Sequence, residues 1–190
     1  MDAVDPPLRA DARRNRDQIL EAAREAFAES GFAVPIDTIA ARAGVGPGTV
    51  YRHFPTKEAL FHAVVTSRLA DLVAEARRRA ADTDPGDAFF GFLARLGAEG
   101  AARRDIPDAI AVPGPLRDEL HAALEVLLTR AQGAGAVRPD ISATDLVALL
   151  KGLLTSAHDD TQPGRAERIL GVVTDGLRAP NPQALRHVGT

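Results

Sequence analysis

The sequence predicts an all-α protein, with an N-terminal three-helix domain, a C-terminal helical domain and about nine helices in total. Three observations predict this fold. Apolar side chains recur at three- and four-residue spacing along most of the chain, proline and glycine separate successive segments, and no segment alternates convincingly as a strand would. With 190 residues, 45% hydrophobic and 26% charged, the chain suits one compact unit or two small ones.

Proline and glycine also indicate where individual helices begin and end. The first helix stops at Ser30-Gly31, where glycine can end a helical turn. Pro35 and Pro47 each open a short helix, because the fixed φ of proline suits a first helical position. A long amphipathic helix begins at Lys57. Later helices are expected at 87–103, 116–131, 143–157 and 164–178, with a short turn near 106–111.

The two short helices are predicted to form a helix-turn-helix. Ala40 is small enough for the helices to touch, and Gly44 can take the positive φ that a tight turn needs. Val45, Val50 and Phe54 then fill the angle between the helices. The second helix keeps a polar outer face, which suits entry into a DNA major groove. A tight corner in an ordinary helical bundle is the alternative interpretation of this pattern.

At this point the sequence resembles the TetR family of bacterial transcriptional regulators. The matching residues are Ile19-Leu20-x-Ala22-Ala23-x3-Phe27-x3-Gly31-Phe32 and then Ile39-Ala40-x2-Ala43-Gly44-Val45-x2-Gly48-Thr49-Val50-Tyr51-x-His53-Phe54-x2-Lys57-x2-Leu60. The resemblance implies a homodimer with an N-terminal DNA-binding domain and a C-terminal domain that dimerises and binds a small-molecule effector. The expected divisions are a flexible arm (1–11), the helix-turn-helix domain (12–56), a connecting helix (57–80), the ligand-binding and dimerisation domain (81–179) and a frayed tail (180–190).

The resemblance and the outward-facing positions together give the expected contacts with operator DNA. The candidates are Arg42, Gly46, Pro47, Gly48, Thr49, Tyr51, Arg52, His53 and Lys57. Lys57 opens a helix, so its cation and the helix N-terminal amides can share one phosphate. Arg52 is the best candidate for a guanine contact, since arginine to guanine is the commonest specific contact. Gly46 and Pro47 replace a polar pair found in many relatives, so few side chains are expected to contact bases.

Charge supports DNA binding only through its position. Residues 1–60 hold eight basic and nine acidic side chains, and the whole chain carries a net charge of −3. Four arginines precede or begin the first helix: Arg9, Arg13, Arg14 and Arg16. They could follow a phosphate strand or reach the minor groove, as the arms of other helical DNA-binding proteins do. A solvated leader is an equal alternative.

The C-terminal half offers a candidate effector pocket and a dimer surface. The pocket candidates are Phe89, Phe90, Phe92, Arg95, Leu96, His121, Leu124 and Leu150, a largely aliphatic set with phenylalanine from one helix. Simple core packing of the phenylalanines is an equal alternative. Ser142 and Asp145 are spaced as a capping box. The last two long helices carry more apolar surface than a monomer needs, and in similar proteins they pair with their copies as a four-helix bundle.

The predicted function is a ligand-responsive, sequence-specific transcriptional regulator, a repressor released from its operator by a small, largely apolar ligand. The alternative is a helical protein-interaction module whose helix-turn-helix no longer reads DNA. An enzyme is not expected, because cysteine, Gly-x-Ser-x-Gly and His-Glu-x-x-His are all missing from the sequence. No cofactor, metal or membrane partner is expected. Without a signal peptide or an apolar run of about 20 residues, a cytoplasmic location is expected.

Overall fold

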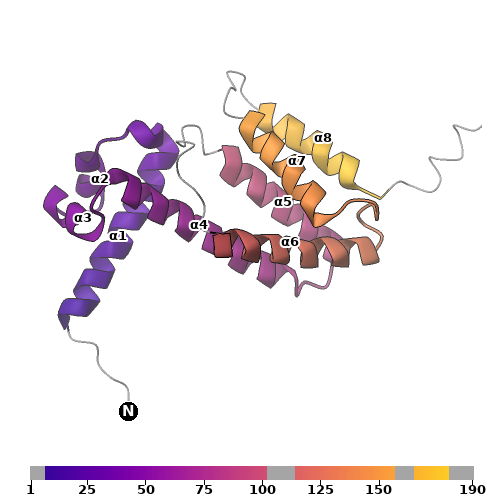
Figure 1. Ribbon diagram of the computed structural model, residues 1–190, viewed down its shortest axis with the longest axis horizontal. Coiled ribbons are helices and arrows are strands. Elements are labelled where there is room, and N and C mark those ends of the chain that lie inside the picture. The colour runs from indigo at the N-terminus through magenta and orange to yellow at the C-terminus, as the bar shows by residue number, and fades with distance from the viewer. Residues whose placement is uncertain (1–6, 102–113, 157–164, 180–190) are drawn as a thin grey trace, which may run out of the picture. The chain divides into compact units, whose positions relative to one another are not determined.

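The computed structural model describes residues 7–101, 114–156 and 165–179 and confirms the all-α prediction (Figure 1). Within these ranges the chain forms eight α-helices and one 3-10 turn, and no strand. The elements are α1 (Pro7–Ser30), η1 (Gly31–Ala33), α2 (Ile36–Arg42), α3 (Pro47–His53), α4 (Lys57–Arg79), α5 (Pro85–Ala101), α6 (Gly114–Gly133), α7 (Ala143–Ser156) and α8 (Arg165–Leu177). The expected turn near 106–111 and the expected tail at 180–190 lie outside the described residues.

The chain divides into two compact units, and α4 belongs to both of them. Unit 1 comprises residues 1–68 and 103–112, and unit 2 comprises residues 69–102 and 113–190. The division therefore falls inside the helix that was expected to connect the domains. None of the described helices is long and apolar enough to cross a membrane.

Unit 1 is built around an aromatic cluster beneath the helix-turn-helix. The Phe61 ring of α4 meets the ring of Phe27 edge-on at 4.9 Å and that of Phe32 at 5.3 Å, measured between centroids. Ile19 and Ala23 of α1 are fully buried beside them. Rings in this edge-to-face arrangement add to the free energy gained from burial alone. The cluster fixes α1 and α4 as the frame that carries the two short helices.

The first helix begins earlier than expected. Residues 7–11 were expected to belong to a flexible arm, but α1 starts at Pro7. Proline is well suited to the first helical position, and no glycine or second proline interrupts the chain from there to Ser30. The arginine-rich leader is therefore helical from residue 7 onward.

Unit 2 has an apolar core and helix ends that arginines hold in place. Phe89 and Phe92 of α5 are fully buried, together with leucines of α6 and α7. Arg130 of α6 donates to the backbone carbonyl of Ala80, and its second donor lies 2.8 Å from the carbonyl of Asp82. Both acceptors lie just beyond the C-terminus of α4. This arginine therefore ties the segment that follows α4 to α6.

The start of α7 follows the predicted capping box. The Asp145 amide donates to the Ser142 Oγ at 3.2 Å, and the Ser142 amide donates to the Asp145 carboxylate at 3.0 Å. The Ser142 hydroxyl donates to the same carboxylate at 2.6 Å. These bonds favour the charged carboxylate and lower the pKa of Asp145, with the hydroxyl as the largest cause. The prediction is confirmed, with aspartate in the place usually taken by glutamate.

Candidate nucleic-acid interface

The turn between α2 and α3 has the predicted geometry. Gly44 has a φ of +68°, which only glycine adopts without strain. The Gly44 amide donates to the carbonyl of Ala41 at 3.2 Å, and the Val45 amide donates to that of Ala40 at 3.0 Å. This pair of bonds is a Schellman motif, which ends α2 and redirects the chain. Ala40 is almost fully buried at the helix crossing, as its small size predicts.

The recognition helix α3 is held by one face and leaves the other open. Val50 and Phe54 are buried, whereas the Tyr51 side chain is 50% exposed. A Cβ added at Gly46 or Gly48 would meet no atom within 4 Å, so this end of the helix faces open space. Backbone at such a site can approach a ligand closely. The first turn of α3 therefore presents bare backbone to a ligand, and its second turn presents side chains.

Arg52 lies along the open face of α3 in a fixed position. Its Nε donates to the carbonyl of Gly48 at 3.3 Å, and its Nη2 donates to the Thr49 hydroxyl at 2.9 Å. The second bond joins two of the residues expected to contact DNA. A guanidinium held in this way loses less freedom when it binds a planar acceptor.

Lys57 lies at the start of α4, as the sequence predicts. The Thr56 hydroxyl accepts a bond from the Ala59 amide at 3.1 Å and so caps the helix. The Lys57 Nζ lies 4.8 Å from the centroid of the Phe32 ring, which holds the half-buried lysine stem in place. Lys57 is also the first residue of α4, and the macrodipole favours an anion at this end of the helix.

Arg42, one of the predicted DNA contacts, pairs with two carboxylates of α1. Its Nη2 bonds the Glu29 carboxylate at 2.7 Å, and its Nη1 lies 3.7 Å from that of Glu25. The hydrogen bond from Arg42 is the largest cause of the lowered pKa of Glu29. Both carboxylates belong to α1, so the guanidinium joins α2 to α1. The sequence did not predict this pairing, because the two carboxylates approach Arg42 only when α2 packs on α1.

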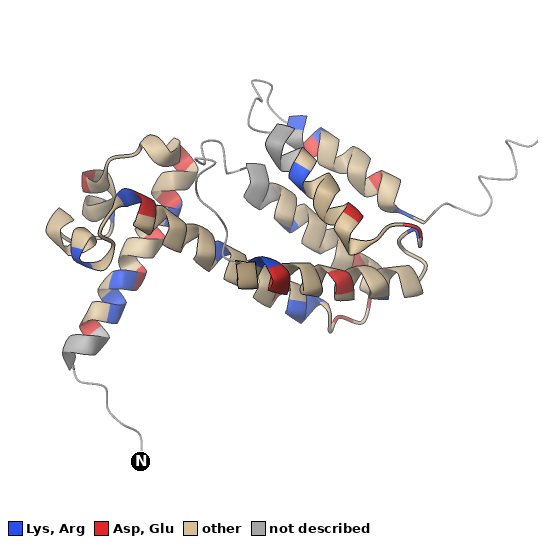
Figure 2. Ribbon diagram, in the orientation of Figure 1, with Lys and Arg blue, Asp and Glu red and all other residues tan. Residues whose placement is uncertain are grey.

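A further cation lies beside α3 that the sequence did not single out individually. The Arg16 guanidinium of α1 sits 5.3 Å from the centroid of the Phe54 ring, directly after the recognition helix. Figure 2 shows basic residues along the N-terminal half of α1 and on α3. The spacing of four residues between Arg16 and the buried Leu20 is the signal that could have placed it on the inner face of α1.

The predicted effector residues of unit 2 fall into two groups. The buried group is Phe89, Phe92, Leu124 and Leu150, and the group that is exposed or half-buried is Phe90, Arg95, Leu96 and His121. Phe90 carries the Arg178 guanidinium over its ring at 4.4 Å. Core packing therefore accounts for Phe89 and Phe92, whereas the Phe90 ring is only half-buried.

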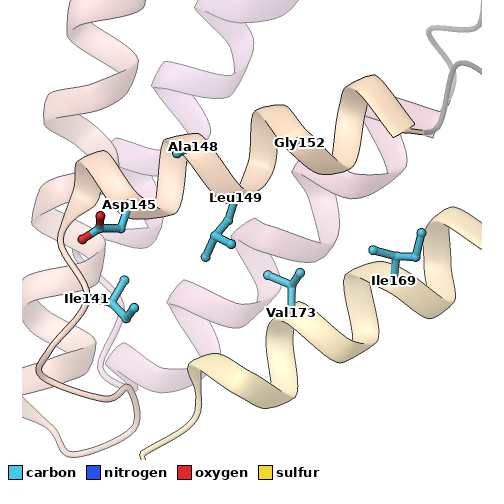
Figure 3. Close-up of a pocket in the computed structure, with 7 residues that line it drawn as sticks. All are labelled: Ile141, Asp145, Ala148, Leu149, Gly152, Ile169 and Val173. Carbon is cyan, nitrogen blue, oxygen red and sulfur yellow. The ribbon is translucent and has the colours of Figure 1, made fainter.

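A groove of about 670 Å³ lies elsewhere in unit 2, between α7 and α8. Figure 3 shows Leu149 of α7 and Ile169 and Val173 of α8 pointing into the space between the two helices. The groove is completed by Ile141, Asp145, Ala148 and Gly152. These are different residues from the predicted effector set. The adjoining surface is also apolar, since the Val172 side chain is 72% exposed.

Two family models match the chain and together span most of it. Residues 19–64 match the model described as bacterial regulatory proteins, tetR family, and residues 84–179 match the model described as transcriptional regulator SbtR-like, C-terminal domain. The second model alone covers half of the chain. The members of this family are transcriptional regulators and not enzymes.

Individual relatives agree with the family models. The chain is 31% identical over 176 residues to the HTH-type transcriptional repressor Rv1474c of Mycobacterium tuberculosis, covering 86% of this chain and 92% of the relative. It is similar to the solved TetR regulator SCO0520 of Streptomyces coelicolor, with 35% identity and a TM-score of 0.71. That match covers 87% of this chain and 99% of the other. It is also similar to a solved TetR regulatory protein of Mycobacterium vanbaalenii, with 42% identity and a TM-score of 0.66. That match covers 90% of this chain and 99% of the other. The chain therefore belongs to the TetR family of helix-turn-helix transcriptional regulators.

Proposed function

We propose that the chain is a repressor that binds a two-fold-related operator as a homodimer and is released by a small, largely apolar ligand. The observation that supports this most strongly is the open face of α3, where Thr49 holds Arg52 and Lys57 lies at the next helix N-terminus. A polar helix braced by a second helix and flanked by cations suits a major groove. Most operator affinity then comes from phosphates and most specificity from few bases.

The proposed contacts divide between bases and backbone. Arg52, presented by Thr49, contacts a guanine. Tyr51, His53 and Lys57 contact phosphates or the groove edge. Gly46, Pro47 and Gly48 let the helix backbone approach closely, because a Cβ added at either glycine would meet no other part of the protein within 4 Å. Arg42, bonded to Glu29 and Glu25, supports this surface by holding α2 on α1.

The groove between α7 and α8 is the proposed dimer surface. An exposed Val172 beside an apolar groove is costly in water, and a second copy would cover it with its own α7 and α8. Ala148 and Gly152 on the groove wall allow helices to approach closely. Two copies joined in this way present two recognition helices, which can read half-sites about one DNA turn apart.

Release by a ligand requires that the ligand bind the DNA-bound and the DNA-free conformations of the regulator with different affinities. A ligand among the helices of unit 2 lowers operator affinity only if it binds the DNA-bound conformation less tightly. Typical coupling energies are about 1–3 kcal/mol, which correspond to about 5- to 150-fold in operator affinity. The residues around Phe90, Leu96 and His121 are the proposed effector-facing set, since they are neither fully buried nor fully exposed.

The experiment that tests this function begins with selection of duplexes from a random-sequence pool by the full-length protein. Fluorescence anisotropy then compares the selected duplex with a scrambled one at two salt concentrations. We expect tight, salt-dependent binding to the selected duplex alone and a loss of about tenfold with Lys57→Ala. Arg117→Ala is the matched control, because that exposed cation lies on α6 and pairs with Asp118 at 3.6 Å. Equal weak binding to both duplexes would support the protein-interaction alternative instead.

A further inference from the structure

The segment that joins α6 to α7 pairs with the end of α8 through its backbone. An isolated antiparallel bridge connects the two stretches. The Arg138 amide donates to the carbonyl of Leu177 at 3.0 Å, and the Ala179 amide donates to that of Ala136 at 3.1 Å. Leu177 is buried at this junction. The chain just before α7 is therefore bonded directly to the end of α8.

Two polar side chains reinforce the junction. The Arg138 guanidinium binds both carboxylate oxygens of Asp140, at 2.6 and 2.7 Å, and its Nη1 donates to the carbonyl of Gly176 at 3.4 Å. The Gln132 amide nitrogen donates to the carbonyls of Arg138 and Ile141, at 3.0 and 2.8 Å. Gln132 belongs to the last turn of α6, so three helix ends meet here. We call Gln132, Arg138, Asp140 and Gly176 the Arg138 clamp.

The Arg138 clamp lies at one end of the groove between α7 and α8. Ile141, whose carbonyl Gln132 binds, also lines the groove, and Figure 3 shows it beside the first turn of α7, away from Gly152. Leu149 and Val173 point into the groove from the two helices and leave about 670 Å³ between them unfilled. Side chains in the groove therefore do not set the separation of α7 and α8 along this stretch.

Apolar packing fixes the two helices less sharply than the clamp does. Leu146 and Leu150 hold α7 on the core of unit 2, and Leu177 holds the end of α8. Burial of apolar surface is not directional, so it tolerates a small tilt or slide of a helix. Hydrogen bonds weaken steeply outside a narrow range of distance and angle. The bonds of the clamp therefore give the separation of α7 and α8 its definite value.

We propose that the Arg138 clamp sets the separation of α7 and α8 and so positions the surface on which a second copy of the chain docks. This inference rests on the proposed function, in which that surface joins the homodimer. A two-fold interface uses the same surface of both copies, so both must have the right separation. The apparent dissociation constant of the dimer then rises with the inverse square of the fraction of monomers that have it. Arg138 and Gln132 are positioning residues, which act through the two helices.

The first measurement is the dissociation constant of the homodimer, from sedimentation velocity of the full chain over a range of concentrations. Arg138→Met keeps the apolar stem of the side chain and removes its guanidinium bonds. If about one third of the variant monomers keep the right separation, the dissociation constant should rise about tenfold. Arg117→Met is the matched control, because that exposed arginine of α6 pairs with its neighbour Asp118, and it should leave the dissociation constant unchanged.

The second measurement reads the separation of the helices directly. The sequence has no cysteine, so Thr144→Cys on α7 and Gly171→Cys on α8 place one spin label on each helix. Both positions are exposed, and a Cβ added at Gly171 meets no atom within 4 Å. Val172→Asp in the same chain is expected to keep the sample monomeric, so that the distance lies within one copy. Double electron–electron resonance should give a broader distance distribution in Arg138→Met than with the clamp intact.

Gln132→Leu removes the two amide bonds of the clamp and should reproduce both changes. An unchanged dissociation constant in Arg138→Met would overturn the proposal, as would a raised constant with an unchanged distance distribution. Far-UV circular dichroism follows the helices of each variant. Loss of helix content in both clamp variants would also overturn the proposal, because the clamp would then be needed for folding and not for positioning.

The same samples separate this inference from the proposed function. If wild type dimerises and Val172→Asp does not, the dimer surface of the proposed function holds, and unchanged clamp variants overturn only the role of the clamp. A monomeric wild type, or a Val172→Asp variant that still dimerises, would overturn the dimer surface and this inference together.

Discussion

One arginine in each unit illustrates a different kind of contact. Arg130 of unit 2 reaches another segment of the chain and binds the backbone carbonyls of Ala80 and Asp82, just after α4. Around α3 of unit 1, Arg52 bonds along its own helix to Gly48 and Thr49. The Arg130 bonds join two segments of the same unit. The Arg52 bonds stay within one helix and leave the side chain on an exposed face.

This difference predicts whether a substitution should change the stability of the protein or its affinity for DNA. Unit 2 joins its helices through an apolar core and through cross-links such as that of Arg130, so changes there should mainly lower the free energy of unfolding. The exposed cations near α3 have little apolar surface to bury, so changes there should mainly lower DNA affinity. The following predictions separate the two consequences.

The largest expected effect is in the core of unit 2. Phe92→Ala should reduce the free energy of unfolding by about 3–5 kcal/mol, because it leaves a cavity where a fully buried ring stood. Phe90→Ala is the matched control on the same helix, and its half-exposed ring should cost about 1 kcal/mol. Urea unfolding followed by circular dichroism measures both. Equal losses would mean that Phe90 is as important to the core as Phe92.

The next effect concerns specificity. Arg52→Ala should reduce discrimination between the operator and a duplex with one half-site base pair replaced by about 1–3 kcal/mol, or roughly 5- to 150-fold. Arg42→Ala should lower the melting temperature and leave that discrimination ratio unchanged, because its guanidinium binds Glu29 of α1. Competition anisotropy gives the ratios. A lower discrimination ratio in the Arg42 variant would indicate that Arg42 contacts a base.

Two glycines near α3 should respond in opposite directions. Gly44→Ala forces a side chain into a φ of +68° and should destabilise unit 1 by about 1–2 kcal/mol. Gly48→Ala adds a Cβ that meets nothing within 4 Å, and the higher helix propensity of alanine should stabilise the protein by about 0.5 kcal/mol. The same methyl group should weaken operator binding, since it stands on the groove-facing end of α3. Thermal melts and anisotropy on the same samples test both signs.

The smallest effect is a pH dependence at the α1–α2 ion pair. The pKa of Glu29 is lowered from its ordinary value of 4.5, mainly by the hydrogen bond from Arg42, so the unfolded chain binds this proton more readily. The stabilisation is present above pH 4.5 and disappears as the pH falls through the lowered folded pKa. Glu29→Gln should therefore melt slightly below wild type at pH 7, and this difference should shrink as the pH falls below 4.5. Glu25→Gln, whose carboxylate is 3.7 Å from Arg42, should show a smaller difference.

Local rules made much of unit 1 predictable. Gly44, Pro47 and Lys57 each carry a conformational preference that acts over a few residues, and each was placed correctly at a turn or helix start. The partners of Arg42 and Arg16 were not predicted, because Glu29 and Phe54 approach them only after the helices have packed.

The helices of unit 2 were predictable but its surface was not. Periodicity identified α7 and α8 and the capping box of Ser142, since these depend on neighbours in sequence. The groove between α7 and α8 depends on the distance between two helices, which no local pattern specifies. The same limit applies to Gly97, where an added Cβ would lie 2.2 Å from a methyl carbon of Leu170 on another helix.

The run Gly46-Pro47-Gly48 limits how much sequence information one recognition helix can carry. Without long side chains in its first turn, α3 has Thr49 and the residues after it to distinguish bases, so about four base pairs per half-site is an upper bound on what it can specify. Two half-sites then specify at most about 16 bits, or one chance match in about 65,000 positions, and a genome of several million base pairs offers about a hundred such matches or more. If the protein is present in few copies, this many chance matches would bind a large share of it and lower its free concentration. Occupancy of the true operator is thus set by the number of regulator copies in the cell as well as by affinity.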